Sequence, residues 1–346
     1  MPAIYTDVQD ELAALGASMA ADGLVAARSV LDGGDIGAEP TASLLSGFSG
    51  LGVPESAGGA GGTLTDLCIL VEQLGRELVP TSFTAHAAAV QAAHAAGLDV
   101  GAAASGEQRW TFGLASADGA GWANWSGPDA SPLGARVAVP HVADADALVT
   151  PCGDDVLTLV DGPFEARRRE GIDPAVRLAD VDLSASNTLR AQAEGASAAL
   201  LRGALVVAAE LSGIGQGALR LAAAYASERE QFGTAIGKFQ GVAHRLADAF
   251  VEVEAGWNLV LYASWALDAG EADAGLIAHA AVGKAGAAAV HAAERGLQVH
   301  GGIGVTWEAD PHLYIRRALA SNAVVGGHAP HTRLAGAAQF ATGVER

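Results

Sequence analysis

The sequence predicts an α+β protein in which a helical N-terminal domain, a small β domain and a helical C-terminal domain follow one another. Apolar residues recur at helical spacing through most of the N-terminal part. Short apolar runs broken by Gly, Pro and Asp follow between Trp110 and Leu183. Long alanine-rich patterns with helical spacing fill the remainder. These changes predict domains at residues 1–107, 108–190 and 191–346.

Composition sets further limits. A chain of 346 residues can bury a large core, and with 50% apolar but only 5% aromatic residues it suits closely packed helices with small contact residues. Cys68 and Cys152 are the only cysteines, which excludes a disulfide framework and a multi-cysteine metal site. The formal net charge of −19 argues against a nucleic-acid partner, because a polyanion would be repelled.

Charges interrupt the apolar stretches, so we expect no transmembrane helix. No basic segment precedes an apolar run near Met1, so we expect no export signal. The sequence therefore predicts a cytoplasmic protein with no membrane partner.

In the N-terminal part, residues 6–31 predict one or two helices that end at Asp32-Gly33-Gly34, and another helical segment begins near Thr41. A glycine-rich loop at 50–62 leads into a predicted helix at 66–78. The loop lacks the Lys-Ser/Thr pair of a phosphate-binding P-loop and follows a helix rather than a strand. We therefore interpret it as a structural loop.

Five apolar runs in the middle region have the length and spacing of strands in a small barrel. They lie at 110–114, 135–139, 147–149, 156–160 and 176–181.

The C-terminal part predicts a four-helix bundle. Its long patterns cover 196–228, 241–269 and 274–299, and shorter ones cover 309–322 and 328–340. An apolar face left exposed on such a bundle predicts an obligate oligomer.

The stretch from 225 to 304 contains the residues that are candidates for binding a ligand. It opens with Arg229-Glu230-Gln231-Phe232-Gly233, continues through Phe239-Gln240, and closes on Gln298-Val299-His300-Gly301-Gly302-Ile303-Gly304. An arginine can bind phosphate oxygens, and glycines let backbone N–H groups approach an anion closely. Taken singly, each signal also fits a surface arginine or a helix cap.

Together these residues resemble the acyl-CoA dehydrogenase family, whose C-terminal domain carries this series. The loop at 50–62, the following Glu72-Gln73-Leu74-Gly75-Arg76 and the domain order match the family too, so the resemblance covers essentially the whole chain. It implies the acyl-CoA dehydrogenase fold and an FAD whose ADP half is bound here while the flavin ring lies in a neighbouring subunit. The residues to which the resemblance gives this role are Arg229, Phe232, Gln240, Gln298, Gly301 and Gly302.

The family's reaction needs a carboxylate that removes a proton from the carbon alpha to the thioester. Family members place this glutamate at one of two positions, which correspond here to Val325 and to Gly203. Neither residue can abstract a proton, so we predict no catalytic base. Glu210 lies two helical turns after Gly203 and is a displaced alternative. Glu308, Asp310, His328 and His331 lie near the C-terminal loops, where such residues usually cap helices or face solvent.

The flavin pocket departs from the family as well. Ala117 and Asp118 replace a Glu-Pro pair of the family, and no Trp-Ile/Val-Thr strand follows. At most a residual flavin-ring site is expected in this β domain.

This pattern resembles the shorter, base-lacking subunit of actinobacterial α2β2 acyl-CoA dehydrogenases that act on sterol-derived substrates. The resemblance implies α,β-dehydrogenation of a steroid-derived or branched acyl-CoA, a catalytic paralogue as partner, and an external electron acceptor. The acidic charge requires a local basic pocket or a more basic partner for an anionic CoA thioester. Two alternatives stay open: a self-sufficient homo-oligomer with a displaced base, and a flavin-free lyase, hydratase or structural protein of the same fold.

Overall fold

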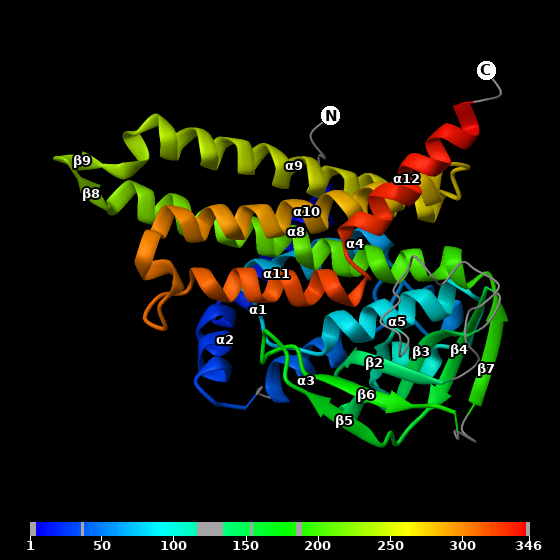
Figure 1. Cartoon of the computed structure of the whole chain (residues 1–346). Coiled ribbons are helices and arrows are strands. Elements are labelled where there is room, and N and C mark those ends of the chain that lie inside the picture. The colour runs from blue at the N-terminus through cyan, green and yellow to red at the C-terminus, as the bar shows by residue number, and fades with distance from the viewer. Residues whose placement is uncertain (1–4, 36–37, 116–133, 153–154, 185–188, 344–346) are drawn as a thin grey trace.

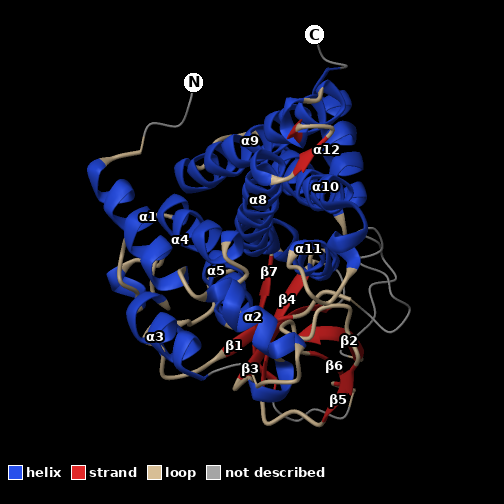
Figure 2. Cartoon of the chain, turned by 90° about the vertical axis from the view of Figure 1, so that its left-hand side faces the viewer, coloured by secondary structure: helices blue, strands red, loops and turns tan. Residues whose placement is uncertain are grey.

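The computed structural model describes residues 5–35, 38–115, 134–152, 155–184 and 189–343. An N-terminal group of helices, a β region and a long C-terminal helical bundle follow one another, which confirms the predicted α+β order (Figure 1). Seen along the bundle, the β region lies on one side of it, next to the N-terminal helices (Figure 2).

The N-terminal region is helical, and the segment 6–31 forms two helices rather than one. Thr6 and Gln9 form a capping box at the start of the first helix, and Thr63 and Asp66 form another at the start of the fourth. The helices are α1 (Asp7–Ala20), α2 (Gly23–Leu31), α3 (Ala38–Phe48), α4 (Leu64–Arg76), α5 (Phe83–Ala95) and α6 (Gly101–Ala104).

The glycine-rich loop between α3 and α4 folds back on itself. The N–H of Gly52 donates to the carbonyl of Gly61 at 2.9 Å, and the N–H of Gly61 donates to the carbonyl of Val53 at 2.8 Å. A Cβ on Gly59 would lie 2.1 Å from the oxygen of Val53, so the loop closes only with glycine at that position. Its backbone groups are therefore used within the loop, as expected of a structural turn.

Helix α4 packs directly against α8 (Ala196–Glu228), the longest helix of the bundle, through glycines on both helices. A Cβ on Gly75 would lie 2.2 Å from the oxygen of Glu210, and one on Gly213 would lie 1.9 Å from the oxygen of Glu72. The buried Glu72 pairs with Arg76 at 2.6 Å. The N-terminal region thus packs on the bundle through residues 72–76.

The strands of the middle region form two sheets that share a core, rather than a closed ring, within the described residues. One sheet has the order β1-β3-β4-β7, with β1 and β3 parallel and the other pairs antiparallel. The other has the antiparallel order β2-β6-β5. The strands are β1 (Trp110–Phe112), β2 (Ala135–Pro140), β3 (Ala147–Cys152), β4 (Val156–Asp161), β5 (Ala166–Arg169), β6 (Leu178–Asp182) and β7 (Leu189–Glu194).

Strand β7 crosses one of the two predicted domain boundaries. It pairs with β4 and ends at Glu194, so the predicted boundary between residues 190 and 191 falls inside a strand of the sheet. The division at 107, which precedes β1, falls in a loop. The division into three domains stays a prediction.

The C-terminal bundle consists of α8, α9, α10 and α11, with α12 packed on α10. Small residues line its contacts, as the composition predicted: a Cβ on Gly256 would lie 3.2 Å from the Cα of Ala285. A short hairpin of β8 (Glu230–Gln231) and β9 (Thr234–Ala235) joins α8 to α9. The remaining elements are α9 (Gln240–Ala269), α10 (Ala274–His300), the 3-10 helix η4 (Gly301–Val305), α11 (Pro311–Val324) and α12 (His328–Gly343).

Three helical segments among the described residues are long and apolar enough to cross a membrane by length and composition alone, namely Asp7–Leu31, Ala196–Glu228 and Ala274–Val305. The prediction that no segment reaches this length is wrong, because runs of alanine keep the hydropathy high despite isolated charges. The protein itself buries 83% of the apolar window in α8 and 67% of that in α10, against 28% in the first segment. Core packing therefore accounts for the apolar character of α8 and α10, and the absence of a membrane partner stays a prediction.

Helix α12 is held to α10 by a pair of histidines. The Nδ1 atoms of His279 and His331 lie 2.9 Å apart, and Nε2 of His331 donates to the carbonyl of Val325 at 3.0 Å. This bond leaves Nδ1 of a neutral His331 as the acceptor for the ring of His279. Burial lowers the pKa of both rings to about 4.

The histidine pair predicts a loss of stability in acid. Both rings have a folded-state pKa of about 4 against an ordinary 6.5, so their full contribution is present above pH 6.5 and is lost as the pH falls towards 4. We expect the free energy of unfolding to fall by about 2 kcal/mol per ring over this range. Denaturant unfolding at several pH values measures it. His279→Gln should reduce the slope, whereas His244→Gln, at an exposed position, should leave it unchanged; equal slopes in both variants would contradict the assignment.

Candidate functional site

The predicted cofactor residues lie at one end of the bundle, where the ends of α8 and α10 meet. The ring of Tyr225, in the last turn of α8, stacks on His300 at the end of α10 with centroids 4.3 Å apart. Beyond His300 the chain turns at Gly301, which has φ +65° and ψ −143°. Only glycine adopts this conformation readily, so the turn itself requires glycine at position 301.

Arg229 is the residue that ends α8. Its N–H donates to the carbonyl of Tyr225 at 2.9 Å, and its own carbonyl accepts from Ile236 at 2.8 Å, so the backbone is fixed while the side chain is exposed. Phe232, at the tip of the hairpin, is 95% exposed and has φ +54°. Its ring lies edge-on to Phe239 of the same chain, with centroids 6.2 Å apart.

The other predicted cofactor residues are exposed. They lie at the start of α9 and the end of α10, at the same end of the bundle as the β8–β9 hairpin (Figure 1). Gln240 is the first residue of α9, a helix start whose positive dipole end favours an anion. Gln298 is exposed in the last turn of α10. A Cβ built on Gly301 or Gly302 would meet nothing within 4 Å, so the backbone there is open to a ligand. An arginine, a helix N-terminus and open glycine backbone suit a diphosphate, and the residues present therefore fit the ADP half of an FAD.

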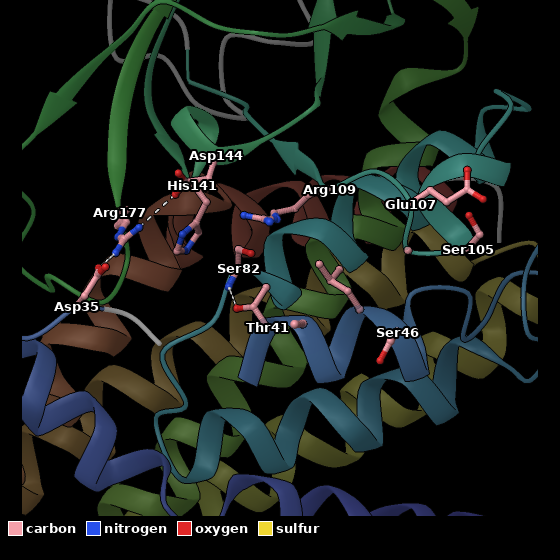
Figure 3. Close-up of a pocket in the computed structure, with 13 residues that line it drawn as sticks. Asp35, Thr41, Ser46, Ser82, Ser105, Glu107, Arg109, His141, Asp144 and Arg177 are labelled. Atoms are coloured by element: carbon pink, nitrogen blue, oxygen red, sulfur yellow. Dashed lines mark hydrogen bonds and ion pairs between the residues drawn. The ribbon is translucent and has the colours of Figure 1, made fainter. Parts of the chain in front are cut away.

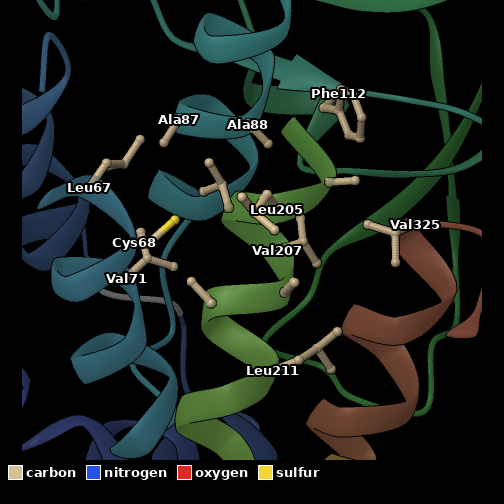
Figure 4. Packing of buried hydrophobic residues seen from close by; sticks show 14 of the residues in the cluster. Leu67, Cys68, Val71, Ala87, Ala88, Phe112, Leu205, Val207, Leu211 and Val325 are labelled. Atoms are coloured by element: carbon tan, nitrogen blue, oxygen red, sulfur yellow. The ribbon is translucent and has the colours of Figure 1, made fainter. Parts of the chain in front are cut away.

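One expected base position, Val325, lies inside a packed apolar cluster (Figure 4), and the other, Gly203, lies against two members of that cluster, Ala88 and Phe112. Val325 is fully buried, in the same cluster as Phe112 and Leu205. Gly203 is buried on α8, and a Cβ there would lie 2.7 Å from the oxygen of Ala88 and 3.2 Å from the ring of Phe112. A carboxylate at either position would displace core side chains or backbone, so the region is closed as well as lacking a base.

Glu210, the displaced alternative, lines a small cavity of about 30 Å³ together with Arg317 and Ser321. Burial raises the pKa of its carboxyl, while Arg317 and a hydrogen bond from Ser321 act in the opposite direction. Arg317 is itself buried and donates to Asp173 at 2.5 Å. The cavity holds about one water molecule, which is far too small for an acyl thioester. Catalysis by Glu210 would require the surrounding helices to move.

The weaker candidates near the C-terminal loops have structural partners. Asp310 pairs with Arg28 of α2, and Nδ1 of His328 lies 3.1 Å from the amide of Asn322. His331 is buried in the histidine pair described above, and Glu308 is exposed. Among the described residues there is also no group of three or more His, Cys, Asp or Glu side chains that could hold a metal ion.

The predicted flavin-ring residues Ala117 and Asp118 lie outside the described residues. The chain just before them follows β1, where a Cβ on Gly113 would lie 3.0 Å from Val139. This strand end is closely packed against β2.

One polar contact that holds the site region together could not be predicted from the sequence. Arg317 reaches Asp173 and the carbonyls of Leu78 and Val79, which lie in three different parts of the chain. No local pattern in the sequence pairs Arg317 with residues so distant.

Comparison with known proteins agrees with this geometry. The family models for the acyl-CoA dehydrogenase N-terminal and C-terminal domains match residues 37–117 and 194–338. The chain belongs to the acyl-CoA dehydrogenase family, whose members are flavin-dependent oxidoreductases, and the fold is the acyl-CoA dehydrogenase fold.

Three relatives are informative. Acyl-CoA dehydrogenase IpdE2 of Mycobacterium tuberculosis is 33% identical over 80% of this chain and 78% of its own length. Acyl-CoA dehydrogenase FadE34 of the same organism is 34% identical over 94% of this chain but over only 47% of its own length. Among solved structures, the Tcur3481-Tcur3483 steroid ACAD superposes with a TM-score of 0.84 at 26% identity, covering 98% of this chain and 99% of that one.

Proposed function

We propose that this chain is the non-catalytic subunit of an FAD-dependent acyl-CoA dehydrogenase that acts on a steroid-derived or branched acyl-CoA. The observation that carries the proposal is a contrast within one structure. Val325 and Gly203 stand at the two base positions inside packed core, whereas the end of the bundle suited to ADP is open and exposed. An FAD held at this end of the bundle would supply the hydride acceptor for the substrate's β carbon, and the proton acceptor would come from the partner.

The relatives support a paired arrangement. The match to FadE34 fills nearly all of this chain but about half of that protein, which leaves room there for a second unit of similar length. The Tcur3481-Tcur3483 steroid ACAD is named after two proteins, as a complex of two different subunits would be. We infer a catalytic paralogue as partner, an α2β2 assembly, an external electron acceptor and a cytoplasmic location.

Exposed aromatic side chains on α9 offer a surface for such a partner. Phe250 is 57% exposed, and Tyr262 and Trp265, each 50% exposed, stack with centroids 5.6 Å apart. Large apolar side chains grouped on one helix are typical of an interface that is buried in the assembly. A more basic partner would also offset the net charge of −19 when an anionic thioester binds.

The test is to purify the chain alone and together with a co-expressed paralogue, then measure the visible absorbance of oxidised flavin and turnover with an artificial electron acceptor. We expect flavin and activity only in the complex. Turnover of the chain alone above about 1 per second would place it in the ordinary enzyme range and favour the self-sufficient alternative with Glu210 as base. Absence of flavin from both preparations would favour the flavin-free alternative.

Val325→Glu is expected to leave the single chain inactive and to destabilise it by about 2 to 4 kcal/mol, because a carboxyl would enter a fully buried apolar site. Val25→Glu, at a position that is 71% exposed on α2, is the matched control and should cost under about 0.5 kcal/mol. Thermal melting and turnover of both variants measure this. Dehydrogenation by the Val325→Glu chain alone would show that only the base was missing.

A further inference from the structure

A cleft of about 590 Å³ lies between the N-terminal helices and the β region (Figure 3), and none of the predicted cofactor residues lines it. Helix α3 and the start of α5 form one wall. The other wall comes from the segment before β1, the turn after β2 and the segment before β6. Its volume is in the range of small-molecule sites. Nothing in the proposed dehydrogenation uses it.

Arg109 provides a positive charge in this cleft. Its N–H donates to Asp146 at 2.7 Å and its carbonyl accepts from the N–H of Asp146 at 2.7 Å, so the backbone is fixed. The guanidinium extends towards His141 and Ser82 (Figure 3), and its buried Nε has no hydrogen-bond partner among the described residues. A buried donor on a cation is costly to leave unpaired, so this group favours an anionic ligand.

Ser82 provides a second unused donor. It is the N-cap residue of α5 and 7% exposed, yet its hydroxyl makes no cap bond and has no partner within the described part of the chain. Its backbone is held by Thr41, whose hydroxyl accepts the Ser82 N–H at 3.4 Å. The N-terminus of α5, a helix of 13 residues, adds a positive dipole end at the same place.

His141 completes this side of the cleft. It is 7% exposed, and its backbone N–H donates to the carbonyl of Arg177 at 2.6 Å. Burial, with smaller contributions from Arg317 and Arg177, lowers its pKa to about 4. The ring is therefore neutral at physiological pH and offers a hydrogen bond without charge.

The far wall limits the charge that the cleft accepts. Arg177 is paired with both Asp35 and Asp144, so its charge is already compensated, and the two carboxylates would repel a dianion (Figure 3). Ala42 and Leu45 of α3 add apolar surface. The cleft thus combines the Arg109 guanidinium, two polar hydrogen-bonding groups and an apolar wall, with the carboxylate of Glu107 farther along its lining (Figure 3).

We propose that this cleft binds a small organic monocarboxylate, with its carboxylate against Arg109, Ser82 and His141 and its apolar body along α3. A phosphate dianion fits less well because of Asp35 and Asp144, and a neutral alcohol leaves the Arg109 guanidinium unpaired. The site is independent of the base positions and of flavin binding.

Calorimetric titration of the purified full chain with hexanoate tests the proposal, with hexanol and inorganic phosphate as comparison probes. We expect saturable hexanoate binding and at least tenfold weaker binding of both comparison probes. Arg109→Gln should weaken hexanoate binding about tenfold or more, and Ser82→Ala about threefold. Arg333→Gln, an exposed arginine on α12, is the matched control and should bind as the native chain does.

Three results would overturn the site. They are no saturable binding at tens of millimolar hexanoate, equal affinity for hexanoate and either comparison probe, and native affinity in both Arg109→Gln and Ser82→Ala. Thermal melting of each variant establishes that it is folded. If Arg109→Gln does not fold, Ser82→Ala, which removes only one hydroxyl, decides the question.

Discussion

Arg317→Met is expected to destabilise the chain by about 3 to 5 kcal/mol, the range for breaking one side of a buried ion pair. Arg317 is 3% exposed and Asp173 is 7% exposed, and the Nε of Arg317 lies 2.5 Å from Oδ2 of Asp173. Methionine fills much of the arginine stem but leaves the carboxylate of Asp173 buried without its counter-charge. It also removes the cation that opposes the raised pKa of Glu210.

The ion pair matters because it joins separate parts of the fold. Arg317 belongs to α11, whereas Asp173 lies between β5 and β6, and the guanidinium also donates to the carbonyls of Leu78 and Val79 after α4, at 3.4 and 3.3 Å. One side chain therefore contacts the bundle, the β region and the N-terminal helices. Its loss should loosen the packing of all three.

Denaturant unfolding of Arg317→Met beside Arg316→Met measures the effect. Arg316 precedes it on the same helix, donates to the carbonyl of Ile172 at 2.9 Å and lies over the ring of Trp307 at 5.3 Å, so its replacement should cost at most about 1 kcal/mol. Adding Asp173→Ala to Arg317→Met should recover part of the loss, because the unpaired charge disappears. Equal stability of the two single variants would show that the buried pair contributes little.

The helices of the bundle could be predicted from the sequence because their patterns are long and local. The expected segment 196–228 coincides with α8, and 241–269 differs from α9 only by its first residue, Gln240. Each helix repeats small and apolar residues over many turns, so the residues that face the core can be recognised from their helical spacing in the sequence.

Two strands of the described β region could not be predicted, and both lie at sheet edges. Strand β5 reads Ala-Arg-Arg-Arg and β7 reads Leu-Arg-Ala-Gln-Ala-Glu, neither of which is an apolar run. They occupy the ends of the orders β2-β6-β5 and β1-β3-β4-β7, where one side of the strand faces solvent and charge protects the edge. Their pairing depends on neighbours that the local sequence does not show.

The functional-site residues also fall into a group that could be predicted from the sequence and a group that could not. Arg229 and Gly301 were recognisable because they sit in short motifs whose spacing is local. The contact between Arg317 and Asp173, 144 residues apart, and the meeting of Ser82, Arg109 and His141 in one cleft depend on how the domains pack. Such contacts follow from tertiary structure and leave no periodic signal in the chain.

Arg229→Ala is expected to strip FAD from the complex with the catalytic paralogue while leaving this subunit folded. The guanidinium is exposed at the end of α8, and its backbone bonds to Tyr225 and Ile236 do not involve the side chain. If it holds the diphosphate, removing a charge-assisted bond worth about 1.5 to 3 kcal/mol lowers FAD affinity roughly tenfold to a hundredfold. Arg229→Lys should recover only part, because an ammonium keeps the charge but loses the two-pronged geometry.

Flavin occupancy and thermal melting of the purified complex, measured side by side, separate this role from a merely structural one. Arg168→Ala removes an equally exposed arginine from β5 and should change neither quantity. A surface ion pair at Arg229 would cost at most about 1 kcal/mol of stability and nothing in flavin content. Unchanged occupancy in Arg229→Ala would therefore refute the role of Arg229 in a shared cofactor site. Lost occupancy with an unchanged melting temperature is the outcome that the open end of the bundle predicts.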